Sequence, residues 1–302
     1  MTSITEPRVR TISAAEPARR WWRSNTWRRL MAHRMFVIGA LLFGLVLLAT
    51  LLAPWIASVD PMKLSMRNRF KPPGAQFWFG TDNLGRDLFS RMVHGARVTL
   101  MIAGAATALS FTMGSILGFV AAVSGGRLDQ FLSRTVDLMM SIPTLILALV
   151  VLSVLPSSVT VLVLVLGFLD STRVFRLARA VAVDIAVMDY VEAARLRGEK
   201  TAWIVFSEIL PNALTPLVSE LGLRFIFAVL FLSGLSFLGL GVQPPDADWG
   251  AMVRENKEGI VFGVPAALIP AAAIGVLTIS VNLVADWVLT RTSSLKGGRG
   301  NG

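Results

Sequence analysis

Long apolar runs without charge constrain the fold of this chain more than any other feature of its sequence. Residues 35 to 53 form one such run and contain no Asp, Glu, Lys or Arg. As an α-helix this run is about 30 Å long, which matches the hydrocarbon core of a lipid bilayer. The composition agrees, because 54% of the residues are hydrophobic and only 16% are charged, unlike the average soluble domain. The sequence therefore predicts an all-α transmembrane protein.

The alternation of apolar and polar segments predicts six transmembrane spans. The first covers residues 35–56 and precedes a loop rich in Pro and Gly at 57–96. The core, 97–290, is expected to hold five more spans, near residues 98–123, 136–155, 159–169, 212–241 and 262–289. Pro143 is expected to kink the third span. The fourth apolar run is too short to cross a bilayer, so we expect its helix to continue past the lipid boundary and carry its arginines, Arg173, Arg176 and Arg179, on the inner side.

Basic residues indicate the orientation of these spans. The net charge is +10, and nineteen Lys and Arg lie in the segments expected inside, against nine outside. This bias follows the positive-inside rule and places both termini in the cytoplasm, as a basic arm (1–34) and a tail (291–302). Acidic residues interleave with the arginines after the fourth run, which argues against nucleic-acid binding. The positive charge is therefore expected to set the orientation of the spans in the lipid bilayer and not to bind a nucleic acid.

A polar amphipathic segment at residues 185–211 separates the fourth and fifth spans. Glu192 and the two alanines after it begin a short helical pattern, in which small side chains permit close approach and the carboxylate offers a directional contact. Gly198 ends that helix, and a second helical pattern follows. Pro211 lies where a new helix can begin without losing a needed hydrogen-bond donor. We expect helix, turn and helix on the cytoplasmic side, in contact with another protein.

This segment resembles the cytoplasmic EAA loop of ABC importer permeases. Residues 80–87 (GTDNLGRD) and 236–252 (SFLGLGVQPPDADWGAM) are typical of the dipeptide, oligopeptide and nickel branch of that family. The resemblance implies a MetI-like type I permease fold with a short external helix before the last span. It also implies that seven residues couple the chain to an ATPase, namely Glu192, Ala193, Ala194, Gly198, Ile209, Leu210 and Pro211.

The same resemblance implies a function and a set of partners. With a second homologous permease, the chain would form a translocation path for di- or oligopeptides or similar small solutes, with nickel chelates as an alternative cargo. Two ATP-binding subunits would bind ATP and Mg, and an extracytoplasmic solute-binding protein would deliver the solute. The location implied is the bacterial inner (plasma) membrane, which the chain crosses several times.

Two ionisable residues, Glu220 and Arg224, interrupt the fifth apolar run. Such groups are costly at membrane depth and usually face a bundle interior or an aqueous path. Their i, i+4 spacing permits a mutual ion pair. Two interpretations stay open, a structural pair that neutralises itself and a contact that lines the translocation path for a charged substrate. The pair also departs from the family pattern, in which the middle of this span is mostly apolar or small, so the solute class is more open.

The external motif at residues 80–87 has a structural interpretation. Asp82, Arg86 and Asp87 are spaced to form a local ion-paired turn, and Gly80 and Gly85 supply the bends. We expect this motif to shape the loop. The residues alone do not indicate whether its surface contacts a partner permease or a solute-binding protein.

The chain lacks the motifs of an enzyme. It has no GxxxxGK[ST] phosphate loop, no GxSxG elbow, no HExxH helix and no cysteine, so neither ATP hydrolysis nor a metal or cofactor site is expected on it. The alternative to an ATP-driven permease is a stand-alone secondary transporter, driven by ions through Glu220, Arg224 and Asp286. Uptake that collapses with the proton gradient while ATP is maintained would distinguish that alternative.

Overall fold

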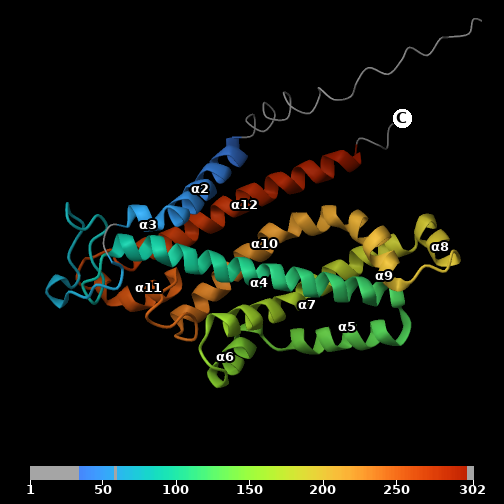
Figure 1. The fold of residues 1–302 in the computed structure, drawn as a ribbon, viewed down its shortest axis with the longest axis horizontal. Helices are drawn as coiled ribbons and strands as arrows, with labels where there is room; N and C mark the ends of the chain where they lie inside the picture. The colour runs from blue at the N-terminus through green and yellow to red at the C-terminus, as the bar shows by residue number, and fades with distance from the viewer. Residues whose placement is uncertain (1–33, 58–59, 298–302) are drawn as a thin grey trace, which may run out of the picture.

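The computed structural model describes residues 34–57 and 60–297, and the regular elements within those ranges are all helices (Figure 1). In chain order the α-helices are α2 (Arg34–Leu51), α3 (Ala53–Ile56), α4 (Leu88–Ser124), α5 (Gly126–Ser141), α6 (Thr144–Val154), α7 (Val159–Ala186), α8 (Asp189–Leu196), α9 (Thr201–Trp203), α10 (Leu210–Phe237), α11 (Trp249–Asn256) and α12 (Leu268–Gly297). Three further elements are the 3₁₀ turns η1 (Met66–Asn68) and η3 (Lys257–Ile260) and the π-helix η2 (Ile204–Ile209). The all-helical prediction is confirmed. The expected arm, 1–34, lies outside the described residues except for Arg34.

The apolar helices account for four or five membrane spans. Within the described residues, four helices are long and apolar enough to cross a membrane, Arg34–Leu51, Leu88–Ser124, Thr201–Phe237 and Leu268–Leu289. A fifth candidate is the pair α5 and α6, which is bent by 87°. Pro143 lies at this break, as the residue before α6, so the predicted kink is present as a sharp corner. The expected fourth span corresponds to α7, whose apolar start leads into an ionisable second half.

The long helix α4 starts earlier than the sequence predicts. It begins at Leu88, and the carboxylate of Asp87 caps it by accepting a hydrogen bond from the Ser90 N–H. With 37 residues it is about 55 Å long, well beyond the thickness of a bilayer core. Helical structure therefore begins before residue 97, within the segment expected as a loop. Polar residues in the first turns, among them Arg91, concealed the start of the helix.

Glycines on α4 let it pack directly against the backbone of α7, and the two helices run side by side in Figure 1. A Cβ atom added at Gly114 would lie 2.6 Å from the carbonyl oxygen of Ser171. One added at Gly118 would lie 2.7 Å from the carbonyl oxygen of Phe175. Gly114 and Gly118 form a GxxxG step, and the close approach that such a step permits is made here within the chain, between α4 and α7.

The segment between the expected spans at 98–123 and 136–155 is mostly helical, because α5 begins at Gly126. After the turn at Gly125, α5 runs for 16 residues and has one polar and one apolar side. Asp129 on this helix forms an ion pair with Arg179 of α7, with 2.5 Å between the carboxylate and the guanidinium. The pattern was missed because an amphipathic helix shows no long apolar run, and the pairing partner is distant in sequence.

One continuous helix leads from the polar segment at residues 185–211 into the apolar run that follows it. Residues Thr201–Phe237 form a single long helix in which η2 connects α9 and α10. Pro211 lies in the first turn of α10, as the sequence predicts, but no break separates α10 from the π-helix before it. The π-helical turn immediately before it changes the backbone hydrogen-bond pattern, so the proline, which has no N–H, is accommodated inside the long helix.

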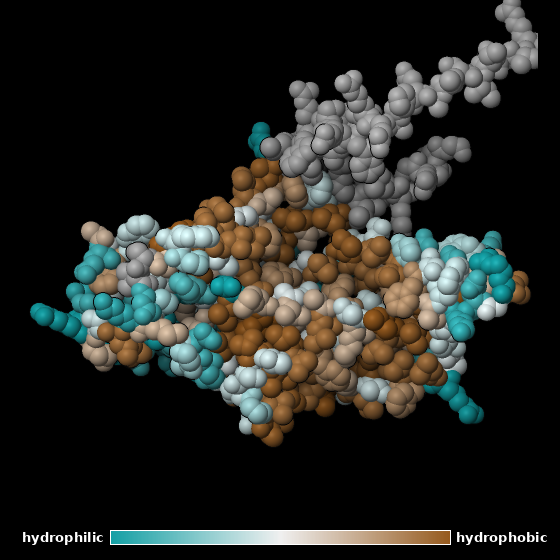
Figure 2. All heavy atoms as spheres, viewed as in Figure 1, coloured by the Kyte–Doolittle hydropathy of each residue, from teal (hydrophilic) through white to brown (hydrophobic). Residues whose placement is uncertain are grey.

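The molecule has an apolar band between two polar ends, as Figure 2 shows. Residues 60–87 and α11 lie at one end, and α8 lies at the other (Figure 1). Small residues bring α12 close to its neighbours, since a Cβ atom at Gly39 or Gly222 would lie 2.7 Å from Leu283 or Ala285, respectively. The band is the part of the surface that a bilayer would cover.

Candidate functional site

The candidate coupling site is the turn between α8 and α9. α8 ends at Leu196, and Gly198 adopts a left-handed backbone with φ of +81°. A Cβ atom added there would meet no atom within 4 Å, so the backbone conformation, and not crowding, requires glycine. The predicted sequence of helix, turn and helix is present.

The two faces of α8 have different surroundings. Glu192 and Ala193 are exposed, whereas Val191 and Ala194 are completely buried. Ala194 was expected to permit close approach of a partner, and the structure corrects this, because its side chain already packs against the rest of the chain. Of the two alanines, only Ala193 is available to a docking protein.

The last three predicted coupling residues, Ile209 to Pro211, also differ in burial. Ile209 is completely buried, Leu210 is half-buried and Pro211 is exposed. Ile209 therefore serves the internal packing beneath α8, and Pro211 is the one of the three residues whose side chain is freely accessible.

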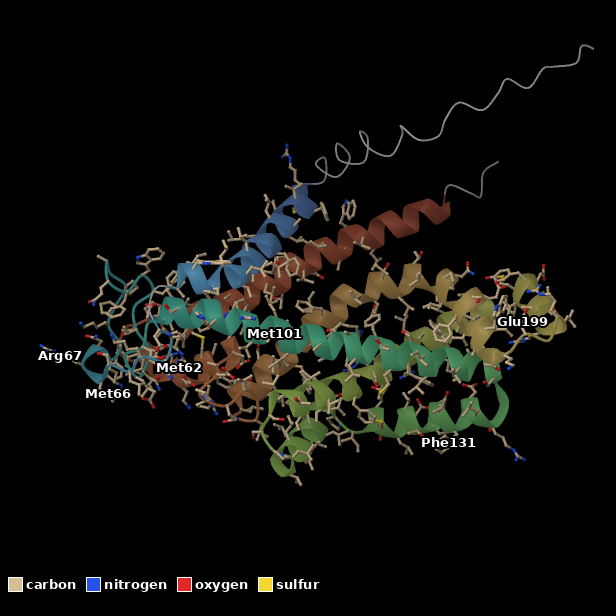
Figure 3. The ribbon with its side chains drawn as sticks, in the orientation of Figure 1. Met62, Met66, Arg67, Met101, Phe131 and Glu199 are labelled. Carbon is tan, nitrogen blue, oxygen red and sulfur yellow. The ribbon has the colours of Figure 1, made fainter. Side chains whose placement is uncertain are left out.

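Large apolar side chains are exposed around this turn. The exposed fraction is 83% for Leu196 and 76% for Val187, and Met188, Tyr190 and Phe206 are also exposed. Figure 3 places the labelled Glu199 at this end of the molecule, beyond the apolar band. An exposed apolar patch rimmed by charged residues marks a protein contact. On this surface the carboxylate of Glu192 is exposed near apolar side chains.

A single hydrophobic cluster connects α8 to the membrane helices. Its buried members come from α4, α7, α8, η2 and α10, namely Phe119, Ala178, Ala182, Ile185, Ala186, Val191, Ala194, Ile204, Val205, Ile209, Ala213 and Leu217. Close-packed side chains transmit displacement because they leave few voids to absorb it. A force on α8 would therefore reach three long helices directly.

Glu220 and Arg224 form the ion pair that their spacing permits. The guanidinium donates to the Glu220 Oε1 atom over 2.5 Å from one nitrogen and 2.9 Å from another. Their side chains are 25% and 13% exposed. Both groups lie within α10, in the apolar part of the molecule.

A third member of this cluster, Asp170, comes from α7. Its Oδ1 atom lies 3.4 Å from Arg224 and 3.6 Å from Arg173, and its Oδ2 atom accepts a hydrogen bond of 3.3 Å from the Ser110 hydroxyl on α4. The cluster thus joins three helices. Sequence reasoning missed Asp170 because it lies 54 positions from Arg224. A signal was nevertheless present, since Asp170 directly ends the fourth apolar run.

At the opposite end, the GTDNLGRD motif is organised around a buried carboxylate. Asp82 accepts hydrogen bonds from the Arg86 and Arg91 guanidinium groups, each over 2.6 Å, and Glu255 of α11 contacts both arginines over 2.8 Å. Gly80 and Gly85 have φ of +78° and +73°. The predicted ion-paired turn is confirmed for Asp82 and Arg86, while Asp87 caps α4 instead.

Asp248 caps the helix α11 from a completely buried position. Its Oδ1 atom accepts a hydrogen bond of 3.0 Å from the Ala251 N–H. Burial raises the pKa of Asp248 to about 6, and this hydrogen bond opposes the shift only in part. Because the folded pKa exceeds the unfolded one, this group destabilises the fold progressively as the pH rises through the interval from about 4 to 6.

The described residues contain no group of three or more His, Asp or Glu side chains arranged to hold a metal ion. The arrangement consists of an exposed apolar surface around α8, a buried hydrophobic cluster beneath it and a charged cluster between helices.

Comparison with known proteins identifies the family. Residues 114–294 match the model of the binding-protein-dependent transport system inner membrane component, and residues 21–73 match the N-terminal transmembrane domain of oligopeptide transport permease C. The first match covers more than half of the chain, so the chain belongs to this family of ABC peptide transport permeases.

Individual relatives agree with this assignment. The chain is 40% identical to a putative peptide transport system permease protein of Brucella abortus, over 86% of this chain and 88% of the relative. It is 34% identical to the di/tripeptide transport system permease protein DppC of Pseudomonas aeruginosa, over 89% of each chain. It is 30% identical to the oligopeptide transport system permease protein OppC of Bacillus subtilis, over 85% of each chain. These relatives support the predicted branch of the family, and membership implies a multi-pass inner membrane protein.

Proposed function

We propose that this chain is one of two permease subunits of an ATP-driven importer for di- or oligopeptides or similar small solutes. The observation that carries the proposal is the position of α8, whose outer face is exposed while its inner face packs into a cluster shared with α4, α7 and α10. If an ATPase subunit binds and moves α8, this packing would transmit the movement to the long helices. The peptide cargo is the one in the names of the relatives.

In this proposal the chain crosses the inner membrane six times, with both termini in the cytoplasm. α7 is the remaining one of these six spans, although its composition is not apolar enough for it to be a candidate span by length and hydropathy alone. Its glycine-mediated contact with α4 and the Asp129–Arg179 pair to α5 support a place for α7 in the helical bundle, and its exposed arginines, Arg173 and Arg176, would lie beyond the lipid boundary on the inner side. The broken pair α5 and α6 counts as one span.

Coupling follows from the packing beneath α8. ATP and Mg bind to two partner ATPase subunits, and closure of those subunits displaces α8. Glu192 supplies a charge-assisted contact to the ATPase, Ala193 and Pro211 allow close approach, and Gly198 allows the turn. The buried residues Ala194 and Ile209, with the half-buried Leu210, pass the displacement to the long helices. Coupling requires that the ATPase contacts differ between the inward-open and outward-open states.

The charged cluster of Glu220, Arg224 and Asp170 acts mainly as a clamp between α7 and α10. Its four ionisable members, Arg173 included, balance in charge, which suits a structural role at membrane depth. Glu220 and Arg224 are only partly buried, so the same cluster borders the translocation path that this chain forms with a second, homologous permease. An extracytoplasmic solute-binding protein delivers the solute at the end that carries α11.

The test is uptake of a labelled di- or tripeptide into cells that carry the complete transporter. The proposal predicts that uptake ceases when ATP is depleted and persists when an uncoupler collapses the proton gradient while ATP is maintained. Uptake that stops with the proton gradient alone would refute it and would favour an ion-driven transporter.

A further inference from the structure

The loop at residues 61–80, here called the basic loop, carries a charge that the topology does not explain. It contains four basic residues, Lys63, Arg67, Arg69 and Lys71, and no acidic residue. The positive-inside rule disfavours basic residues on the outer side. Three arginines at this end have an acidic partner, since Arg86 and Arg91 bind Asp82 and Arg69 contacts Glu258. In the part of the chain that the structure describes, Lys63, Arg67 and Lys71 are exposed and make no ion pair.

The basic loop is held in a fixed shape. The Ser65 N–H donates to the Leu84 carbonyl over 3.2 Å, and the Phe70 N–H donates to the Asp82 carbonyl over 3.1 Å. The Phe70 ring is buried against the core that contains α4 and α12. A Cβ atom at Gly85 would overlap the Ser65 carbonyl oxygen. The basic loop therefore packs directly against the backbone of the segment that follows it. A surface that is already ordered binds at a lower entropic cost.

Exposed apolar side chains lie among these charges. Met62, Leu64 and Met66 are 50%, 63% and 64% exposed. In Figure 3 Met66 and Arg67 lie at the far end of the molecule, and Arg67 points away from the apolar band of Figure 2. This direction leads into the aqueous phase and not toward lipid headgroups beside the band. Apolar groups surrounded by unpaired positive charge suit the surface of a soluble, acidic protein.

We propose that the basic loop is an electrostatic docking surface for an acidic face of the extracytoplasmic solute-binding protein. This inference rests on the proposed function, because that function requires such a partner. Lys63, Arg67 and Lys71 attract and orient the partner during encounter, and the methionines and Leu64 contact it once it is seated. Surface charges of this kind act chiefly on the association rate and its salt dependence.

The experiment measures association of the purified solute-binding protein with the complete transporter in nanodiscs. The variant is the triple reversal Lys63→Glu, Arg67→Glu and Lys71→Glu. The matched control is Lys257→Glu, which reverses an exposed base at the same end of the molecule. Recovery of the assembled complex and its basal ATP hydrolysis check that each variant is folded. Nanodiscs are prepared from phosphatidylcholine alone and with added phosphatidylglycerol.

At low ionic strength the triple variant is expected to associate at least about tenfold more slowly than wild type. Its rate should respond little to salt, and the control should resemble wild type in both lipid mixtures. A wild-type rate independent of salt, or a triple variant equal to the control, would overturn the inference. A defect confined to nanodiscs with phosphatidylglycerol would overturn it in favour of an anionic lipid contact. If wild type takes up peptide with ATP but charge reversal has no effect on association, the docking surface is refuted and the proposed function stands. If wild type neither binds the solute-binding protein nor takes up peptide, the proposed function is refuted as well.

Discussion

Replacing Arg224 with methionine tests the charged cluster between α7 and α10. The substitution leaves Glu220 without its cation and leaves Asp170 with Arg173 alone, at 3.6 Å. Removing one partner of a buried ion pair costs about 3–5 kcal/mol, because the other charge stays buried. Arg224 and Glu220 are 13% and 25% exposed, so water reduces the cost and we expect the lower end of that range, about 3 kcal/mol. The ratio of folded to unfolded protein would fall roughly a hundredfold.

The assay is thermal denaturation of the purified complex in mild detergent, together with the yield of assembled complex. The matched control is the double variant Glu220→Gln with Arg224→Met, which removes both charges of the pair and should recover most of the lost stability. If the single and double variants are equally unstable, or if Arg224→Met resembles wild type, the clamp is refuted.

The exchanged pair, Glu220→Arg with Arg224→Glu, separates the two roles of the cluster. From the sequence alone, a structural pair should tolerate this exchange. The structure corrects that expectation, because a carboxylate at position 224 would face Asp170 and repel it. We expect the exchange to be less stable than the neutral double variant. Intact assembly with an altered peptide preference would instead favour the path-lining role.

Three further predictions concern glycines and a buried acid. Gly114→Val should destabilise the protein by about 1–3 kcal/mol or more, because its side chain would meet the α7 backbone, whereas Gly104→Val on the same helix meets open space and should change the melting temperature little. Gly198→Val should leave the protein assembled in the membrane but uncouple peptide uptake from ATP hydrolysis, since the left-handed backbone costs a branched residue about 1–2 kcal/mol; unaltered peptide-stimulated uptake would count against this role. Asp248→Asn should remove a fall in unfolding free energy of about 1 kcal/mol per pH unit between about pH 4 and 6, measured by thermal melts across that range, and an unchanged slope would show that Asp248 is not its source.

Sequence reasoning succeeded where short-range rules determine the structure. The i, i+4 spacing of Glu220 and Arg224 specified their ion pair, and Gly198 specified the end of α8. Apolar runs located the first, second, fifth and sixth spans because burial in lipid demands uninterrupted apolar length. These features depend on neighbours within a few residues.

The features that were missed depend on partners far along the chain. Asp170 joins the charged cluster because α7 packs beside both α10 and α4. Arg91 looks like a loop residue in the sequence, yet it lies within α4 because Asp82 and Glu255 neutralise it. The burial of Ala194 could not be predicted from the motif, since a motif does not indicate which face of a short helix meets the chain's own core.

The most direct test of the account is a mild-detergent pull-down of the tagged chain from its native membranes, with wild type compared with Glu192→Lys by mass spectrometry. Glu192 is exposed on α8, so the reversal should not disturb the fold. The account predicts that wild type recovers a second permease and ATP-binding subunits, and that the variant retains the permease but loses the ATP-binding subunits. Recovery of the chain alone or as a homo-oligomer, unchanged by the substitution, would contradict it.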